Sequence, residues 1–179
     1  MSRRIPMSGA VVGGGLLLVL GAGAWLGVTA EDQTTDPALE RTRRQVRMLD
    51  DLYKTAVVLI TDKYVHTESD FSAGSAANAL FAAMRKKGWH DVRLLDASGQ
   101  PFLEKNLPRD EFEKAATKAL VGGETYYEQV VKGDNGTREL RAATPVPVVS
   151  EKCTICHDNY KDVPAGQAIG LLSYRLKVE

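Results

Sequence analysis

The stretch that decides the fold is residues 125–145, TYYEQVVKGDNGTRELRAATP. Two β-prone runs, Thr125–Lys132 and Thr137–Pro145, flank a short polar connection. The pair Asn135-Gly136 in that connection is typical of a tight hairpin, because both residue types accept the positive φ angles that such turns require. The stretch therefore predicts two antiparallel strands joined by a hairpin.

Three helices are predicted before this hairpin and a strand after it. Apolar residues recur at three- and four-residue steps from Leu39 to Ile60, which predicts one long amphipathic helix ending near His66 or Thr67. We expect its apolar end, Ala56–Ile60, to meet the core and its arginine-rich first half to stand off the membrane. The other predicted elements are helices at Gly74–Lys87 and from Pro108 to Leu120, and strands at Val92–Leu95, Gln100–Leu103 and Ala168–Val178, the first two joined by a turn at Asp96–Gly99. This order describes an α+β domain with an antiparallel sheet.

The first 30 residues differ from the rest in composition. Arg3 and Arg4 precede 24 uncharged residues, Met7–Ala30. A membrane-spanning helix needs about 20 apolar residues and a secretory signal about 7 to 15, so this length favours a retained anchor. The small residues Val28-Thr-Ala30 leave a cleaved signal peptide open. In both cases the arginines keep the N-terminus in the cytoplasm, and everything after residue 30 is expected on the exported, periplasmic side.

Composition limits what the remaining chain can bind. The 179 residues include 23 Lys and Arg against 23 Asp and Glu, so we expect no nucleic-acid partner, which would need a clustered basic surface. Two cysteines are too few for a disulfide-dense scaffold. The expected organisation is an anchor or signal peptide at 1–30, a spacer and the start of the long helix at 31–44, and one domain at 45–179.

Both cysteines lie in a single motif. Cys153-Thr-Ile-Cys156-His157 matches C-x-x-C-H, the attachment sequence of c-type haem. Two thiols at this spacing can each reach one vinyl group of the same porphyrin, and the adjacent histidine can then ligate the iron. The sequence therefore predicts one covalently attached haem c bound by Cys153, Cys156 and His157, with His157 as the metal ligand. No catalytic residue is predicted.

Three other uses of the C-x-x-C-H motif are possible. A disulfide between Cys153 and Cys156 would close only a tiny loop and add little stability. A thioredoxin-like redox pair needs a helix start after a parallel strand, whereas Pro145 and Pro147 precede this motif. A zinc site needs four ligands arranged as a tetrahedron. The adjacent residues Cys156 and His157 cannot easily occupy two corners of the same tetrahedron. Haem remains the favoured interpretation.

The surroundings of the motif resemble the PAS-like single-haem c-type cytochrome domain over residues 45–178. The similar features are the long first helix, a helix followed by Val92–Leu95, the segment Asn106–Glu113, a Tyr-rich strand, Ala143–Val146, the late C-x-x-C-H and Ala168–Ser173. The resemblance implies a central antiparallel sheet flanked by helices that clamp the haem. It also implies thioether bonds to Cys153 and Cys156, and His157 as the proximal ligand. Small soluble cytochromes c differ, since only 22 residues follow His157 and none is methionine.

The sequence does not identify the second axial ligand of the haem iron. Some relatives use a cysteine from the helical region, but both cysteines here are committed to the macrocycle. The candidates are His66, His90 and Met84, and water or an open position is the remaining possibility. Each candidate also has an ordinary role, as a solvated histidine or as core filling. Arg93, Lys105 and Arg109 are candidates for pairing with haem propionates, although each could equally be solvated.

Three functions follow from these features. The favoured one is a membrane-tethered or exported monohaem cytochrome that passes single electrons to a redox partner protein. The alternative is a haem-based redox or gas sensor that acts through a partner protein, with the long first helix as a lever. A haem enzyme such as a peroxidase is least favoured, because no distal acid–base residue can be assigned.

Overall fold

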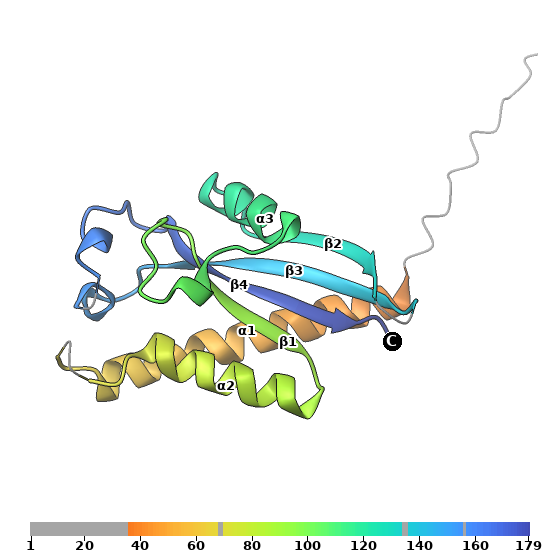
Figure 1. Cartoon of the computed structure of the whole chain (residues 1–179), viewed down its shortest axis with the longest axis horizontal. Helices are drawn as coiled ribbons and strands as arrows, with labels where there is room; N and C mark the ends of the chain where they lie inside the picture. The colour runs from red at the N-terminus through yellow and green to blue at the C-terminus, as the bar shows by residue number, and fades with distance from the viewer. Residues whose placement is uncertain (1–35, 68–69, 134–135, 156) are drawn as a thin grey trace, which may run out of the picture. The chain divides into compact units, whose positions relative to one another are not determined.

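The computed structural model describes residues 36–67, 70–133, 136–155 and 157–179, which belong to one compact unit (Figure 1). The predicted anchor or signal peptide at residues 1–30 lies outside them, as do Asn135 and Cys156. In the part of the chain that is described, no helix is both long enough and apolar enough to span a bilayer.

The first element is the long predicted helix, α1 (Pro37–Tyr64). It begins where the Asp36 carboxylate accepts hydrogen bonds from the backbone N–H groups of Ala38 and Leu39, both at 3.1 Å. Pro37 suits the first helical position, because its missing N–H would have no partner there. The helix ends at Val65, which is extended. It runs without a break through residues 44 and 45, the predicted start of the domain.

Two shorter helices follow with clear caps. In α2 (Ala73–Lys87), Ser72 is the N-cap and Gly88 ends the helix in the left-handed conformation, with φ of 75°. In α3 (Glu111–Val121), the Asp110 carboxylate caps the backbone N–H of Glu113 at 2.9 Å. Both helices were predicted. Pro108, however, lies before the α3 cap rather than in its first turn, because Asp110 supplies the cap.

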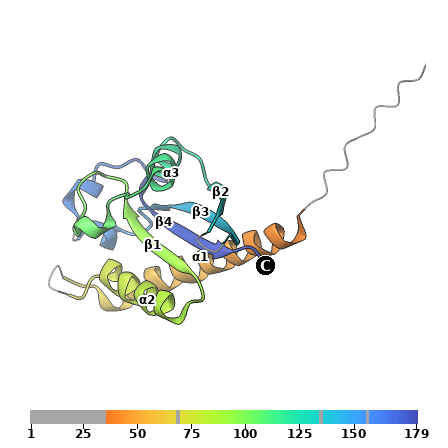
Figure 2. The same cartoon turned by 45° about the vertical axis from the view of Figure 1, so that its right-hand side comes forward.

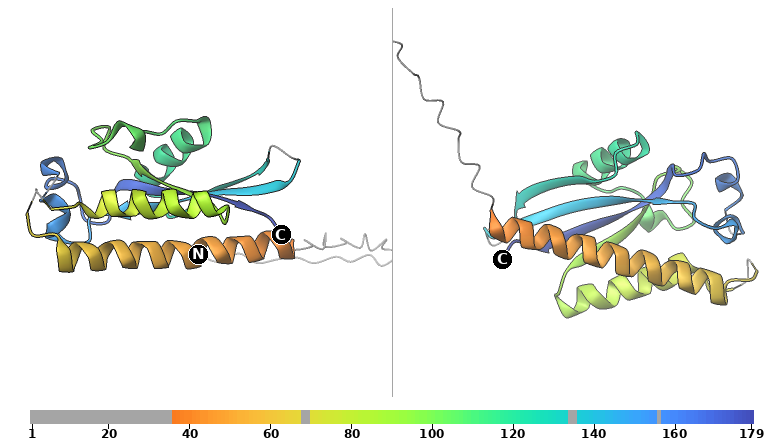
Figure 3. Two further views of the ribbon diagram at one scale, coloured as in Figure 1. Left: turned by 60° about the horizontal axis from the view of Figure 1, so that its bottom comes forward. Right: turned by 180° about the vertical axis from the view of Figure 1, so that it is seen from behind.

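Four antiparallel strands form the sheet in the order β1-β4-β3-β2 (Figures 1 and 2). They are β1 (Asp91–Asp96), β2 (Tyr127–Lys132), β3 (Arg138–Pro147) and β4 (Ala168–Lys177). Helices α1 and α2 cover one face and α3 covers the other (Figure 3). The predicted α+β class, the β2–β3 hairpin and the final strand are confirmed.

The predicted returning strand at Gln100–Leu103 is wrong. The six residues of β1 pair with β4 instead. After β1 the Asp96 carboxylate accepts hydrogen bonds from the Ser98 hydroxyl and from the Gly99 backbone N–H, both at 2.7 Å, which turns the chain. Pro101 then lacks the N–H that a strand must donate.

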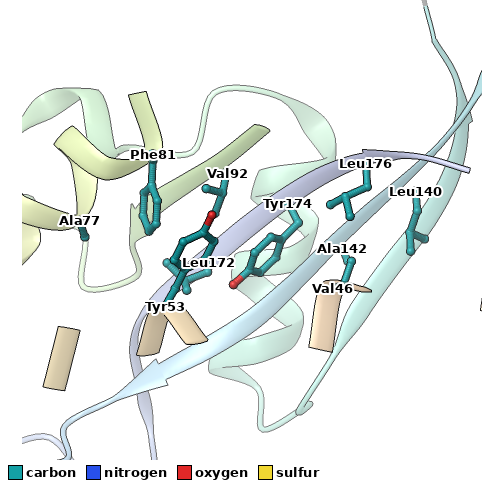
Figure 4. Close-up of a cluster of buried hydrophobic side chains, with 10 residues drawn as sticks. All are labelled: Val46, Tyr53, Ala77, Phe81, Val92, Leu140, Ala142, Leu172, Tyr174 and Leu176. Carbon is teal, nitrogen blue, oxygen red and sulfur yellow. The ribbon is translucent and has the colours of Figure 1, made fainter. Parts of the chain in front are cut away.

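Residues along β3 and β4 alternate between the two faces of the sheet. One cluster lies beneath α1 and α2 and includes Leu140, Leu172 and Tyr174 (Figure 4). The Tyr53 ring of α1 meets the Phe81 ring of α2 edge to face in this cluster, at 5.1 Å between centroids. A smaller cluster beneath α3 contains Leu95, Phe112, Ala116, Leu120, Ala143 and Leu171.

The orientation of α1 differs from the prediction. Val46 is fully buried in the arginine-rich half, where it packs in the cluster beneath α1 and α2. In the half expected to meet the core, Val57 packs against this cluster as predicted, but Val58 and Leu59 are exposed. The reason is that one face of α1 packs against the sheet along the whole helix. The number of apolar residues in a short segment does not show which face this is.

Gly170 occupies a position in β4 where a side chain would collide with β1. A Cβ atom there would lie 2.7 Å from the Leu95 carbonyl oxygen. We expect Gly170→Ala to lower the free energy of unfolding by about 1–3 kcal/mol, as overpacking does. Chemical denaturation of the full chain, followed by circular dichroism, measures this change. Gly74→Ala is the control, because its Cβ would meet Leu94 Cδ2 at an ordinary 3.6 Å; an equal loss in both variants would contradict the prediction.

Candidate functional site

An apolar cavity of about 260 Å³ lies between the α1–α2 layer and the sheet. Its walls come from helices α1 and α2, strands β1, β3 and β4, and the loop after β3. The residues around it are Tyr53, Lys54, Val57, Val58, Thr61, Asp62, Gly74, Ala77, Leu94, Val146, Pro147, Val149, Ser150, Cys153, Ile169 and Leu172. A concave site with mostly apolar walls and a few polar groups is the usual form of a cofactor pocket.

Cys153, the first residue of the C-x-x-C-H motif, lines this cavity. It lies in η2 (Glu151–Thr154), a short 3₁₀ helix that Ser150 caps by accepting a hydrogen bond from the Lys152 backbone N–H at 3.2 Å. The Lys152 ammonium group donates to the Asp62 carbonyl oxygen of α1 at 2.6 Å. This contact ties the motif loop to the α1 wall of the cavity.

His157 is not among the described residues that line the cavity. It immediately precedes η3 (Asp158–Tyr160), and its ring stacks on Tyr160 at 4.5 Å between centroids and meets Phe102 edge to face at 6.0 Å. Burial lowers the pKa of His157, and the nearby Asp96 carboxylate opposes this only in part. The neutral imidazole that results is the form that binds metals.

None of the three candidate distal ligands is among the described residues that line the cavity. His66 is exposed beyond the end of α1, where its backbone N–H donates to Asp70 at 2.7 Å. His90 Nε2 lies 2.6 Å from the Tyr53 hydroxyl, and burial lowers the His90 pKa. Met84 is partly buried on α2.

The candidate propionate partners lie away from the cavity. Arg93 points to the α3 face of the sheet, where it pairs with Glu113 and donates to the Lys105 carbonyl oxygen at 2.8 Å. The Arg109 backbone N–H also donates to Glu113, at 2.8 Å. Arg93, Lys105 and Arg109 therefore gather around one carboxylate and its neighbouring carbonyls, on the side of the sheet opposite α1.

The polar side chains that α1 places in the cavity wall were not predicted from the sequence. Tyr53, Val57 and Thr61 line it at four-residue steps, a spacing that could have identified one helix face. Lys54 also lines it and pairs with Asp50 at 2.8 Å. The Asp50 carboxylate further accepts hydrogen bonds from Tyr174 at 3.0 Å and from Thr144, and these contacts between α1 and the sheet could not be read from the sequence.

These residues fit the chemistry of a covalently bound haem. The cavity has the apolar walls that a porphyrin requires, a thiol in one wall, and a neutral imidazole four positions further along the motif. Cys156 completes the motif in the sequence and lies outside the described residues.

The sequence of this chain matches a known protein family. It matches the model of the Tll0287-like family over residues 31–173. This match covers most of the chain and includes strands β1 to β3, the first part of β4, the cavity walls and the C-x-x-C-H motif. The chain belongs to the Tll0287-like family. For this Tll0287-like protein, no match was found among curated proteins or among solved structures.

Proposed function

We propose that this Tll0287-like protein is a membrane-tethered or exported monohaem c-type cytochrome with a PAS-like haem domain, and that it transfers single electrons to a redox partner protein on the periplasmic side. The observation that carries the proposal is the position of Cys153 in the wall of an apolar cavity. An apolar cavity bounded by a C-x-x-C-H thiol combines the attachment chemistry and the low-polarity surroundings that a c-type haem needs.

Each part of the site has a role in this proposal. A haem held there supplies a one-electron iron couple. Cys153 and Cys156 form the thioether bonds, and His157 donates a ring nitrogen to the iron. The apolar walls, including Val57 and Leu172, exclude water and so favour the less charged state of the iron. Among the described lining residues Lys54 is the only base, so it would be the propionate partner in place of Arg93, in competition with its ion pair to Asp50.

A second candidate function is a haem-based gas sensor. It is favoured by one specific observation: His66, His90 and Met84 do not line the described cavity, and no motif links them to its wall as the C-x-x-C-H motif links His157, which also does not line it, to Cys153. An iron held by His157 without a second protein ligand would be able to bind small neutral gases. In this alternative the α1 wall, which carries Tyr53 and Thr61, would contact the bound gas and pass the change to a partner protein.

The experiment uses the full chain produced in a host that matures c-type cytochromes. Intact mass is measured first, and we expect one haem to be added to the polypeptide. Absorption spectra of the oxidised and reduced protein are then recorded with and without carbon monoxide or nitric oxide. A six-coordinate spectrum that the gases do not change supports electron transfer, whereas rapid gas binding supports sensing. A colourless protein with the mass of its amino acids alone contradicts both.

A further inference from the structure

Helix α1 carries a second apolar stripe that the domain itself does not cover. Met48, Leu52 and Leu59 on this helix are 63%, 59% and 54% exposed. Thr55, also exposed, lies between the two leucines in the same line. We call residues 48, 52, 55 and 59 the outer stripe. Large apolar side chains gathered on one exposed face mark an interaction surface more often than single ones do.

The outer stripe is distinct from the face of α1 that builds the core. Val46 and Tyr53 are buried beneath the helix against the sheet and α2. At about 100° of rotation per residue, Leu52 and Leu59 point well away from both of them. A surface helix of a single domain needs one apolar face, so the second one has no use within the described fold.

The spacing of the outer stripe indicates what covers it. Its steps are four, three and four residues, which is the alternation of the apolar positions in a coiled coil. Such a seam is complementary to another helix with the same spacing, and a second copy of α1 provides one. The stripe is self-complementary in the way that a two-fold interface requires.

The chain before α1 sets the direction of pairing. Only residues 31–36 separate the apolar run that ends at Ala30 from the first turn of α1. Two copies with that run in one membrane would therefore start their α1 helices at the same level and point them the same way. We propose that the protein is a parallel homodimer in which the outer stripes of two α1 helices pack against each other. This inference does not rest on haem binding, but the parallel direction rests on the membrane tether of the proposed function.

The dimer is tested first by its mass. The full chain in detergent micelles is examined by analytical ultracentrifugation, and we expect a dimer. Leu52→Glu/Leu59→Glu should weaken the dimer at least about tenfold, since it removes two buried leucines per copy and opposes like charges. Val121→Glu/Val130→Glu is the matched control, because both valines are exposed and lie outside α1. A monomeric wild-type chain, or a dimer that the glutamates leave intact, would overturn the proposal.

Cysteine cross-linking tests the direction. In a parallel dimer residue 48 meets residue 48 and residue 59 meets residue 59, so Met48→Cys and Leu59→Cys should each give disulfide-linked dimers in membranes. Arg47→Cys carries the same native cysteines but lies off the stripe, and it should not cross-link above the wild-type background. Cross-linking only when Met48→Cys and Leu59→Cys are combined would show antiparallel helices and refute the parallel arrangement.

Discussion

Full-length protein in which Cys153 and Cys156 are both replaced by alanine should contain no covalently bound haem. The thioether bonds need both sulfur atoms, and the sequence holds no other cysteine. In a maturing host, the wild-type chain should keep its haem through denaturation, while the double variant should lose it completely. Intact mass and haem staining of a denaturing gel measure this difference.

Single substitutions separate the roles within the motif. Cys153→Ala or Cys156→Ala should leave at most one thioether bond. His157→Ala removes the iron ligand and keeps both sulfurs, so haem should stay attached with a changed absorption spectrum. Thr154→Ala is the control: its hydroxyl donates to the Glu151 carbonyl oxygen in the same turn, at 2.7 Å. Haem retained by the double cysteine variant would show that another group holds it.

A variant outside the motif tests the cavity itself. Val58 lines the cavity and is 41% exposed, so Val58→Trp can narrow the entrance without overfilling the core. We expect less attached haem although both cysteines are present. Val130→Trp, on β2 and away from the cavity, should retain the wild-type amount. Equal haem content in the two variants would place the haem elsewhere.

The elements that the sequence predicted well are those fixed by local chemistry. The β2–β3 hairpin follows from a short polar turn between two β-prone runs, and Gly136 has the positive φ, 74°, that such a turn needs. The end of α2 follows from Gly88, and the start of α3 is close to the expected position because Asp110 is a strong cap. Each of these signals acts within a few residues.

The predictions that failed depended on contacts between distant residues. The partner of β1 is β4, which lies more than seventy residues later, and nothing near Gln100 reports that pairing. The side of α1 that faces the sheet was also hidden, because Leu52 and Leu59 fit an amphipathic pattern as well as Val46 does. The same distinction applies to the candidate site. The C-x-x-C-H motif could be recognised in the sequence, but the residues that surround it in the cavity wall could not be predicted.

The Arg93–Glu113 pair gives the largest expected effect on stability. The Glu113 side chain is 3% exposed and the Arg93 side chain 16% exposed, on the α3 face of the sheet. Arg93→Met leaves a buried carboxylate whose remaining partner, within the part of the chain that the structure describes, is the Arg109 backbone N–H at 2.8 Å. Because removing one partner of a buried ion pair strands the other charge, we expect the free energy of unfolding to fall by about 3–5 kcal/mol.

A double variant distinguishes a stranded charge from lost packing. Arg93→Met/Glu113→Met removes both charges and keeps similar volumes, so it should be more stable than Arg93→Met alone. Arg85 and Asp91 form an exposed pair, with side chains 52% and 40% exposed, and Arg85→Met should cost less than about 1 kcal/mol. Urea denaturation of the full chains gives all four values. The double variant lacks the Glu113 carboxylate, so the free-energy cost of an unpaired buried charge is absent from it. If it is nevertheless no more stable than Arg93→Met, lost packing and not the unpaired charge explains the lower stability of Arg93→Met.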